Sequence, residues 1–129
     1  AVRSAQAMGQ IGALADSAQV LNGTTTVTAV LPDGITGDDL RKIALELKAR
    51  APQSAVALIS ANEGKPVLVV AVSDAAKATG LKAGALVKIG STILGGGGGG
   101  KDDFAQGGGT DASKSQAALV AIADSISGK

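Results

Sequence analysis

The last third of the chain contains a glycine-rich segment whose residue types suit the binding of phosphate groups. Residues 95–100 are six consecutive glycines, Lys101 follows them, and a second glycine cluster occupies residues 107–109. Glycine lets a ligand approach the backbone closely, clustered backbone N–H groups can bind an anion, and a nearby lysine adds a point charge. We therefore predict that residues 95–109 form a functional glycine-rich loop that can bind an anion such as phosphate. The candidate binding residues in this segment are Gly96, Gly97, Gly98, Gly99, Gly100, Lys101, Phe104, Gln106, Gly107 and Gly108.

A flexible linker is the alternative for this segment, because glycine tracts usually connect domains. An ordered, functional loop is favoured because no serine interrupts the six glycines and because Lys101, Phe104 and Gln106 follow them between two helical patterns. The segment also imitates two nucleotide-binding motifs, the P-loop and GxGxxG. We reject both, because Asp102 stands where a P-loop has Ser or Thr, and because the glycines follow a predicted helix instead of a strand.

The side chains of this segment allow more than one role. Phe104 is the only aromatic residue; it could stack on an unpaired base or hold the loop to the core, and we favour the core because a lone aromatic side chain is usually buried. Gln106 is expected to hydrogen-bond the loop backbone. Asp102 and Asp103 could bind a metal ion, but we interpret them as solvated turn residues, since magnesium sites usually rely on substrate phosphates as well.

Two basic residues outside the segment complete the candidate site. Arg41 and Lys48 lie seven positions apart on a predicted helix and therefore share a face. They could follow a phosphate backbone, or they could belong to a solvated face with Asp38 and Glu46, which is the usual meaning of such mixed charges. The whole chain has a net charge of only +1. We therefore expect modest affinity for nucleic acid from this chain alone.

Composition excludes several classes of function. The chain contains no His and no Cys, so it lacks the Ser-His-Asp and Cys-His catalytic systems, structural zinc sites of the usual kind and disulfides. No catalytic residue, metal ligand or cofactor is predicted within it. Its apolar runs are too short to span a bilayer and no signal peptide is recognisable, so no membrane partner is expected. The absence of cysteine suits a cytoplasmic origin.

The hydrophobic pattern predicts an α/β (α+β) fold in which helices are layered on a small, mostly β sheet. The chain has 129 residues, of which 45% are hydrophobic, and this fits one globular domain over residues 22–129. Residues 1–21 are expected to form a separate helix, the tail of a longer helical element. Further helices are predicted over residues 38–50 and 82–94 and after Asp111 or Ser113. Strands are predicted over residues 24–31, 54–61 and 66–73, and the last two strands should form a hairpin. The helices and the sheet are expected to form two layers.

The glycine-rich segment resembles the signature that closes alanyl-tRNA synthetases, GG-x-GGG-[KR]-x-x-[FM]-A-Q-[AG]-GG. The six glycines, Lys101, Phe104, Ala105, Gln106 and the second glycine cluster all match this pattern in register. The similarity extends upstream through residues 20–23 (VLNG), residues 39–41 (DLR) and the apolar hairpin. It therefore covers nearly the whole chain.

The resemblance implies the C-terminal (C-Ala) domain of that family, with a globular part of the DHHA1 type. Such a domain would bind the elbow of tRNA, here tRNA-Ala, and help the aminoacylation and editing domains to act on the same tRNA. Residues 1–21 would be the end of its helical subdomain, which makes a homodimer possible. The fragment would have no catalytic activity, and the ATP, Mg²⁺ and zinc sites of the parent enzyme would lie outside it.

Three alternatives to a tRNA-binding domain stay open at this point. Residues 1–21 could make the chain an oligomerisation module of the same enzyme. A free-standing alanyl-tRNA editing protein could end in a similar domain. A DHH-type phosphodiesterase is the third, but its glycine loop typically continues GGG-His, and this chain contains no histidine.

Overall fold

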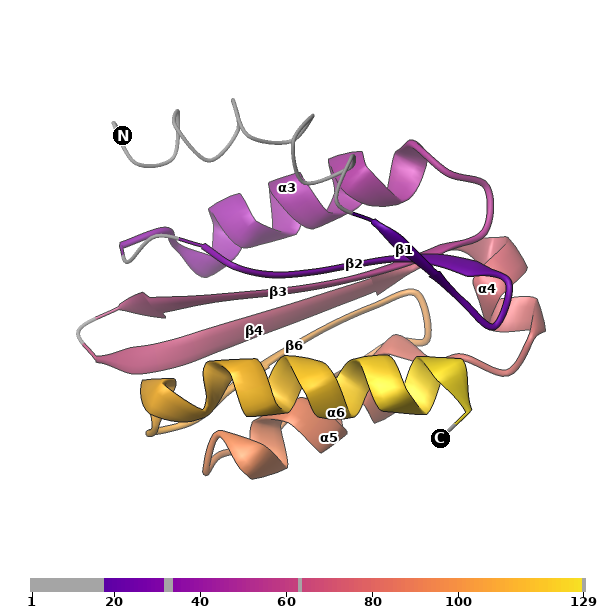
Figure 1. The fold of residues 1–129 in the computed structure, drawn as a ribbon. Coiled ribbons are helices and arrows are strands. Elements are labelled where there is room, and N and C mark those ends of the chain that lie inside the picture. Colours follow the sequence, from indigo (N-terminus) through magenta and orange to yellow (C-terminus); the bar gives the residue numbers. More distant parts are fainter. Residues whose placement is uncertain (1–17, 32–33, 63, 129) are drawn as a thin grey trace.

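The computed structural model describes residues 18–31, 34–62 and 64–128. Within these ranges six strands form one mixed sheet in the order β1-β2-β3-β4-β6-β5, with helices on both faces (Figure 1). The strands are β1 (Gln19–Leu21), β2 (Thr24–Val30), β3 (Ser54–Asn62), β4 (Lys65–Val72), β5 (Gly98–Gly100) and β6 (Phe104–Gly108). The helices are α3 (Gly37–Ala49), α4 (Asp74–Ala78), α5 (Ala83–Ile93), the short 3-10 helix η1 (Ala112–Lys114) and α6 (Ser115–Ser127).

A tight hairpin of β1 and β2 forms one edge of the sheet. Asn22 and Gly23 both have positive φ, 53° and 81°, which is the combination that a two-residue type I′ turn requires. The predicted helix over residues 1–21 is therefore wrong for residues 19–21, because Asn22 and Gly23 join two strands instead of ending a helix. Residues 1–17, which carry the rest of that prediction and the possible dimerisation helix, lie outside the described residues.

Helix α3 connects the two parallel strands of the sheet. Because β2 and β3 run parallel, with Val27 opposite Val56, the chain must cross one face of the sheet between them. The Thr36 hydroxyl begins α3 by accepting a hydrogen bond of 3.2 Å from the backbone N–H of Asp39, which confirms the predicted cap. The buried stripe that faces the sheet consists of Leu40, Ile43, Ala44 and Leu47, as their spacing indicates.

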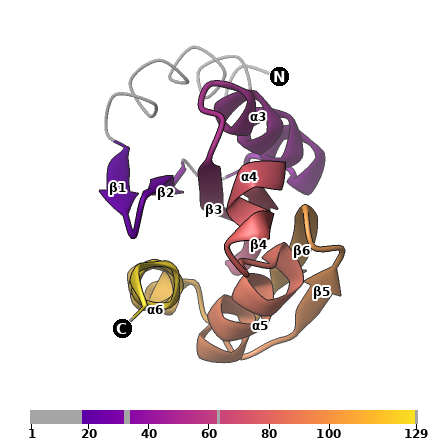
Figure 2. The ribbon, with the colours of Figure 1, turned by 90° about the vertical axis from the view of Figure 1, so that its right-hand side faces the viewer.

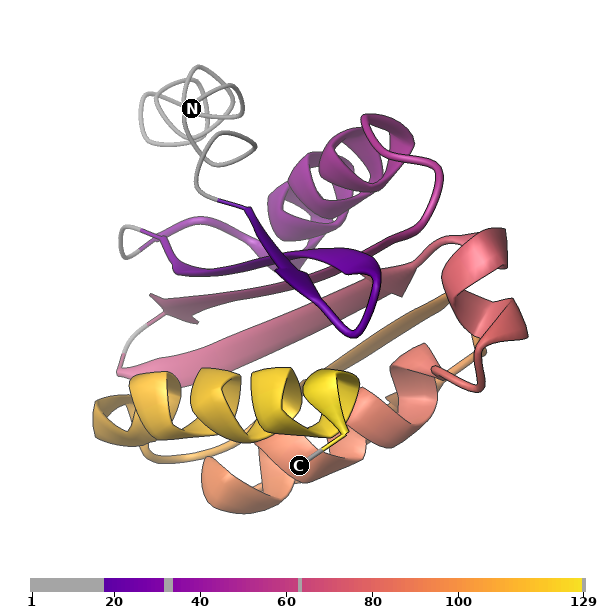
Figure 3. The ribbon, with the colours of Figure 1, turned by 45° about the vertical axis from the view of Figure 1, so that its right-hand side comes forward.

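The antiparallel hairpin of β3 and β4 forms the centre of the molecule (Figure 3). Its alternate residues belong to two different cores: Val56 and Leu58 pack toward α3, whereas Ala57 and Ile59 pack toward α5 and α6. The run from Leu68 to Val72 on β4 is fully buried. This confirms the prediction that both faces of the second hairpin strand are covered.

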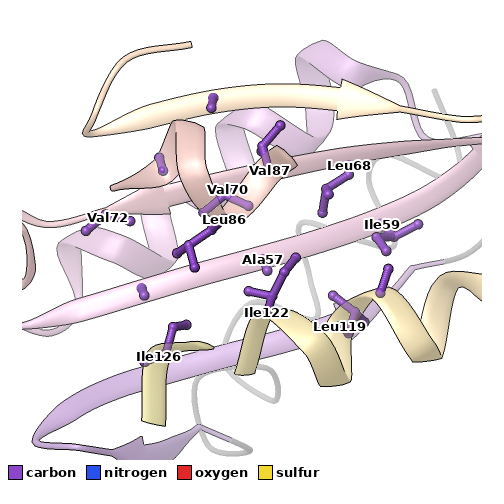
Figure 4. Packing of buried hydrophobic residues seen from close by; sticks show 14 of the residues in the cluster. Ala57, Ile59, Leu68, Val70, Val72, Leu86, Val87, Leu119, Ile122 and Ile126 are labelled. Carbon is purple, nitrogen blue, oxygen red and sulfur yellow. The ribbon is translucent and has the colours of Figure 1, made fainter. Parts of the chain in front are cut away.

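Helices α5 and α6 cover the face opposite α3 (Figure 1). A Cβ atom added to Gly90 on α5 would lie 2.6 Å from Cδ2 of Leu68 and 2.9 Å from Cδ1 of Ile122, so glycine lets this helix pack close to β4 and α6. The fold is the expected α+β class, but with three layers instead of the predicted two. The residues that α6 turns toward the sheet are the predicted Leu119, Ile122 and Ile126 (Figure 4).

The glycine-rich segment differs from the predicted loop, because most of it forms the other edge of the sheet. Strand β6 pairs with β4, and β5 pairs with β6 so that Gly99 lies opposite Gln106. Helix α5 packs on this hairpin (Figure 2). A Cβ atom on Gly98 would lie 2.6 Å from Cγ1 of Val87, and one on Gly107 would overlap Oγ of Ser91. Side chains at these two positions would push the helix away.

Helix α4 is a described helix that the sequence patterns did not indicate. It has five residues, too few to show a helical repeat, and begins where the Ser73 hydroxyl accepts a hydrogen bond from the backbone N–H of Ala76. The final helical region is confirmed: Asp111 caps η1, which leads directly into α6.

Candidate nucleic-acid interface

An open hollow of about 380 Å³ lies between the first turns of α3 and the hairpin of β5 and β6. Neighbouring residues of the hairpin alternate between its two faces. Gly98 and Gly107 face α5, so their partners Gly99 and Gln106 face the side of α3. The hollow is lined by Arg41, Gly99, Gly100, Lys101, Asp103, Phe104, Ala105 and Gln106.

Arg41 and Phe104 form the wall of this hollow together. The Arg41 guanidinium carbon lies 5.4 Å from the centre of the Phe104 ring, a cation–π contact. Phe104 is half-buried and packs against the core beneath α3. The ring therefore connects the hairpin to the core, which was the favoured prediction, and also holds the guanidinium at the hollow.

Lys101 begins the turn between β5 and β6, and that turn is fixed from two sides. The backbone N–H of Lys101 donates to the carbonyl oxygen of Phe104 at 2.9 Å. The first N–H groups of α5 bind the same turn: Ala83 donates to the Asp102 carbonyl at 2.9 Å and Gly84 donates to the Lys101 carbonyl at 3.2 Å. The exposed Lys101 side chain therefore projects from a well-supported turn.

The hollow contains two cations without an acidic partner among residues 18–31, 34–62 and 64–128. Neither Arg41 nor Lys101 forms an ion pair there; the salt bridge in this part of the chain joins Lys77 to Asp74. Asp103 is a half-buried acidic residue of the same hollow. Its position was not predicted, because both acidic residues of the turn were interpreted as solvated. The site thus has an excess of positive charge, as a phosphate requires.

The predicted nest of glycine N–H groups is not formed, because the segment is extended as strands and several of its donors bind within the sheet or to neighbouring turns. Lys101 donates to Phe104 within the hairpin, and the N–H of Gly108 donates to the carbonyl of Gly97. At the ends of the segment, Gly96 donates to the Ser91 carbonyl, and the N–H of Gly109 donates to the Pro66 carbonyl. A ligand at this hollow would therefore contact the cationic side chains and the backbone of the glycine strand β5.

The predicted site residues divide into two groups. The hollow brings together Arg41, Gly99, Gly100, Lys101, Phe104 and Gln106. Outside its lining are Gly96, Gly97, Gly98, Gly107, Gly108 and Lys48. Lys48 follows Arg41 by two helical turns, about 10 Å along α3. Gly98 and Gly107 face α5, and a Cβ atom on Gly96 would overlap the carbonyl oxygen of Gly108, so packing requires glycine there.

Gln106 differs from its predicted role. Its carboxamide was expected to bond the loop backbone, but it makes no hydrogen bond to any other residue of the described chain. It lies over Gly37 in the first turn of α3, where an added Cβ atom would come within 2.6 Å of its Nε2 atom. The signal for this placement was the spacing of Phe104 and Gln106, which puts both side chains on one face once the segment is a strand.

The described residues offer neither a metal centre nor a membrane-spanning helix. No three side chains of the types His, Cys, Asp or Glu come together there as a metal-binding group. No helix in that part of the chain has the length and apolar character needed to cross a membrane.

The profile of the DHHA1 domain matches residues 22–128 of this chain. The chain belongs to the DHHA1 family. The alanine–tRNA ligase of Thermobifida fusca (strain YX) is 40% identical to this DHHA1 chain over 130 residues, which is 98% of the chain and 15% of that ligase. The alanine–tRNA ligase of Arthrobacter sp. (strain FB24) is 56% identical over 91 residues, which is 69% of the chain and 10% of that ligase. The DHHA1 chain thus spans only a small part of these relatives.

Solved structures with the same fold include a domain of an alanyl-tRNA synthetase. The C-Ala domain from Aquifex aeolicus alanyl-tRNA synthetase matches with a TM-score of 0.80 and 26% identity, over 86% of this chain and 98% of that chain. RecJ from Thermus thermophilus matches with a TM-score of 0.67 and 15% identity, over 99% of this chain and 18% of that chain, and shares the fold. The predicted resemblance to the C-terminal domain of alanyl-tRNA synthetase is confirmed.

Proposed function

We propose that this DHHA1 chain is the C-terminal, tRNA-binding domain of an alanine–tRNA ligase. The relatives support the parent enzyme, since the alanine–tRNA ligase of Thermobifida fusca (strain YX) aligns with 98% of the chain. The observation that carries the binding function is the hollow beside α3, where Arg41 and Lys101 are both without an acidic partner in the described chain. Two such cations at one open surface suit the phosphates of a nucleic acid.

The two cations would contact phosphate in different ways. The guanidinium of Arg41 offers a planar set of donors that fits two phosphate oxygens at once, whereas Lys101 acts as a point charge. Gly99 has no side chain that would keep the backbone of a nucleic acid away from the hollow. No atom lies within 4 Å of the position that its Cβ would occupy. These contacts give affinity without recognition of sequence.

Within the parent enzyme the domain would contact the elbow of tRNA-Ala and hold that tRNA for both the aminoacylation and the editing domain. A net charge of +1 gives modest affinity to the chain alone. Attachment to other RNA-binding domains of the parent enzyme would raise the effective concentration of this domain at the tRNA and so supply the remaining affinity. The ATP, Mg²⁺ and zinc sites would lie elsewhere in this cytoplasmic enzyme, so the isolated domain would not be catalytic.

Binding to fluorescently labelled tRNA-Ala over a salt series tests the proposal. The label belongs on the RNA because the chain has no Trp and no Tyr. Wild type should bind at low salt and lose affinity as salt rises. Arg41→Ala and Lys101→Ala should each weaken binding severalfold and reduce the slope of log K against log salt by about 0.7–0.9 per lost phosphate contact.

The matched control is Lys65→Ala. Lys65 is an exposed lysine at the turn of β3 and β4 and does not line the hollow. Its substitution removes the same net charge, so an equal loss of affinity in all three variants would mean that only total charge matters. Absence of tRNA binding by folded wild type at low salt would refute the proposed function.

A further inference from the structure

The exposed Gln106 carboxamide lies over the first turn of α3 and has unused hydrogen-bonding capacity. Its Nε2 atom lies so close to Gly37 that any side chain there would displace it. It makes no hydrogen bond to another residue of the described chain. One face of the hollow therefore offers both a donor and an acceptor from the same side chain.

Gly99, directly opposite Gln106 on β5, leaves open space beside this carboxamide. The two residues pair across the hairpin and so lie on the same face. The φ angle of Gly99 is not positive, so its backbone conformation does not require glycine. No atom lies within 4 Å of the position that a Cβ atom would occupy there. The fold thus leaves room over Gly99 for a ligand group that contacts Gln106.

The chemistry next to the phosphate-binding cations favours a sugar as that group. In a nucleic acid the unit adjoining each phosphate is the ribose, and its 2′-hydroxyl both donates and accepts, like a carboxamide. A stacked base is less well suited, because the Phe104 ring is already in contact with the Arg41 guanidinium and with the core.

We infer that Gln106 hydrogen-bonds the 2′-hydroxyl of a ribose that lies over Gly99, so that this hollow distinguishes RNA from DNA. The inference rests on the proposed function, since it assumes that Arg41 and Lys101 hold the neighbouring phosphates. Gln106 then determines specificity, whereas the two cations provide affinity.

Binding of transcripts with altered ribose tests this assignment. Labelled tRNA-Ala is compared with two versions that carry 2′-fluoro in place of the 2′-hydroxyl, at all pyrimidines or at all purines. Fluorine keeps the sugar pucker of RNA but cannot donate a hydrogen bond. Wild type should bind one of the two versions about fivefold more weakly than the unmodified transcript, as the loss of one hydrogen bond implies.

Substitutions show whether Gln106 causes that difference. Gln106→Ala should bind all three transcripts equally, at the level of the weaker one, while Gln116→Ala, at an exposed glutamine on α6, should behave like wild type. Gly99→Val should weaken binding to all transcripts, and Gly97→Val should not. Gly97 is the matched control, because its Cβ position is equally empty but it does not line the hollow.

The outcomes separate this inference from the function on which it rests. If wild type binds all three transcripts equally and Lys101→Ala still weakens binding, the tRNA-binding function stands and the ribose contact is refuted. The same holds if Gln106→Ala preserves the difference between transcripts. If wild type binds none of the transcripts at low salt, the proposed function itself fails.

Discussion

The guanidinium carbon of Arg41 lies 5.4 Å from the centre of the Phe104 ring, and this contact joins helix α3 to strand β6. Phe104 is the only aromatic residue of the chain. Its ring packs on the core beneath α3 and faces the hollow as well. The pair therefore links the stability of the hairpin to the position of a cation that we propose to bind phosphate.

Phe104→Leu should weaken tRNA binding through Arg41. The substitution keeps an apolar side chain but removes the cation–π contact, which contributes about 0.5–1 kcal/mol at an exposed site. A double-mutant cycle with Arg41→Ala, measured by tRNA binding at one salt concentration, isolates this contribution. Phe104→Leu should have little further effect once Arg41 is gone. An equal loss in both backgrounds would show that the ring acts independently of Arg41, for example by contacting RNA directly.

Alternate glycines of the hairpin should differ in their contribution to stability. A Cβ atom on Gly98 would lie 2.5 Å from Cα of Gly107, whereas one on Gly97 meets nothing within 4 Å. Gly98→Ala should therefore lower the free energy of unfolding by about 1–3 kcal/mol through overpacking. Gly97→Ala should leave it unchanged or raise it by up to about 1 kcal/mol, because the unfolded chain loses freedom. Urea unfolding measures both, and equal effects would contradict the alternating pattern.

The amphipathic elements could be predicted from the sequence because each carries its own periodic signal. Leu40, Ile43 and Leu47 indicated α3, and the apolar hairpin of β3 and β4 was located almost to the residue. Helix α6 was found from the same kind of stripe. In each case the residues that define the pattern are the residues that the structure buries.

The edges of the sheet could not be predicted in the same way. Strand β5 consists of glycine alone, so it has no alternation of apolar and polar side chains and takes its conformation from pairing with β6 and packing under α5. At the other edge, Asn22 and Gly23 are a strong hairpin signal that was interpreted as the end of a helix. The missed strand β6 affected the predicted site, because only a strand places Phe104 and Gln106 on one face.

Ser91→Ala should stabilise the protein. Ser91 is fully buried on α5, and its hydroxyl oxygen has no hydrogen-bond partner in the described chain. A buried polar group without a partner costs about 1–3 kcal/mol, so removing the hydroxyl should raise the free energy of unfolding by about 1 kcal/mol in urea titration. Ser60→Ala is the control: Ser60 is equally buried but donates to the Ile35 carbonyl at 2.6 Å. A loss of stability in both variants would show that Ser91 has a partner in solution.

The Asp111 carboxylate should make stability depend on pH in the acid range. It accepts hydrogen bonds from the Ser113 hydroxyl and from the Ser113 backbone N–H, the latter at 3.1 Å. The hydroxyl bond is the main reason why the pKa of Asp111 lies below its ordinary value of 3.8; burial opposes the shift. Since the pKa is lower in the folded state, the stabilisation is complete above the ordinary pKa and is lost as pH falls through the folded-state value.

Comparison of wild type with Asp111→Asn tests this dependence. The difference in free energy of unfolding between the two proteins should be constant above about pH 5 and should shrink below about pH 4, where the wild-type carboxylate takes up a proton. Ser113→Ala removes the main cause of the shift and should reduce the same acid-range change. Urea unfolding at a series of pH values measures all three proteins. A difference that stays constant down to pH values of about 2 would mean that Asp111 has the same pKa in the folded and unfolded chain, and that the cap of η1 acts without its charge.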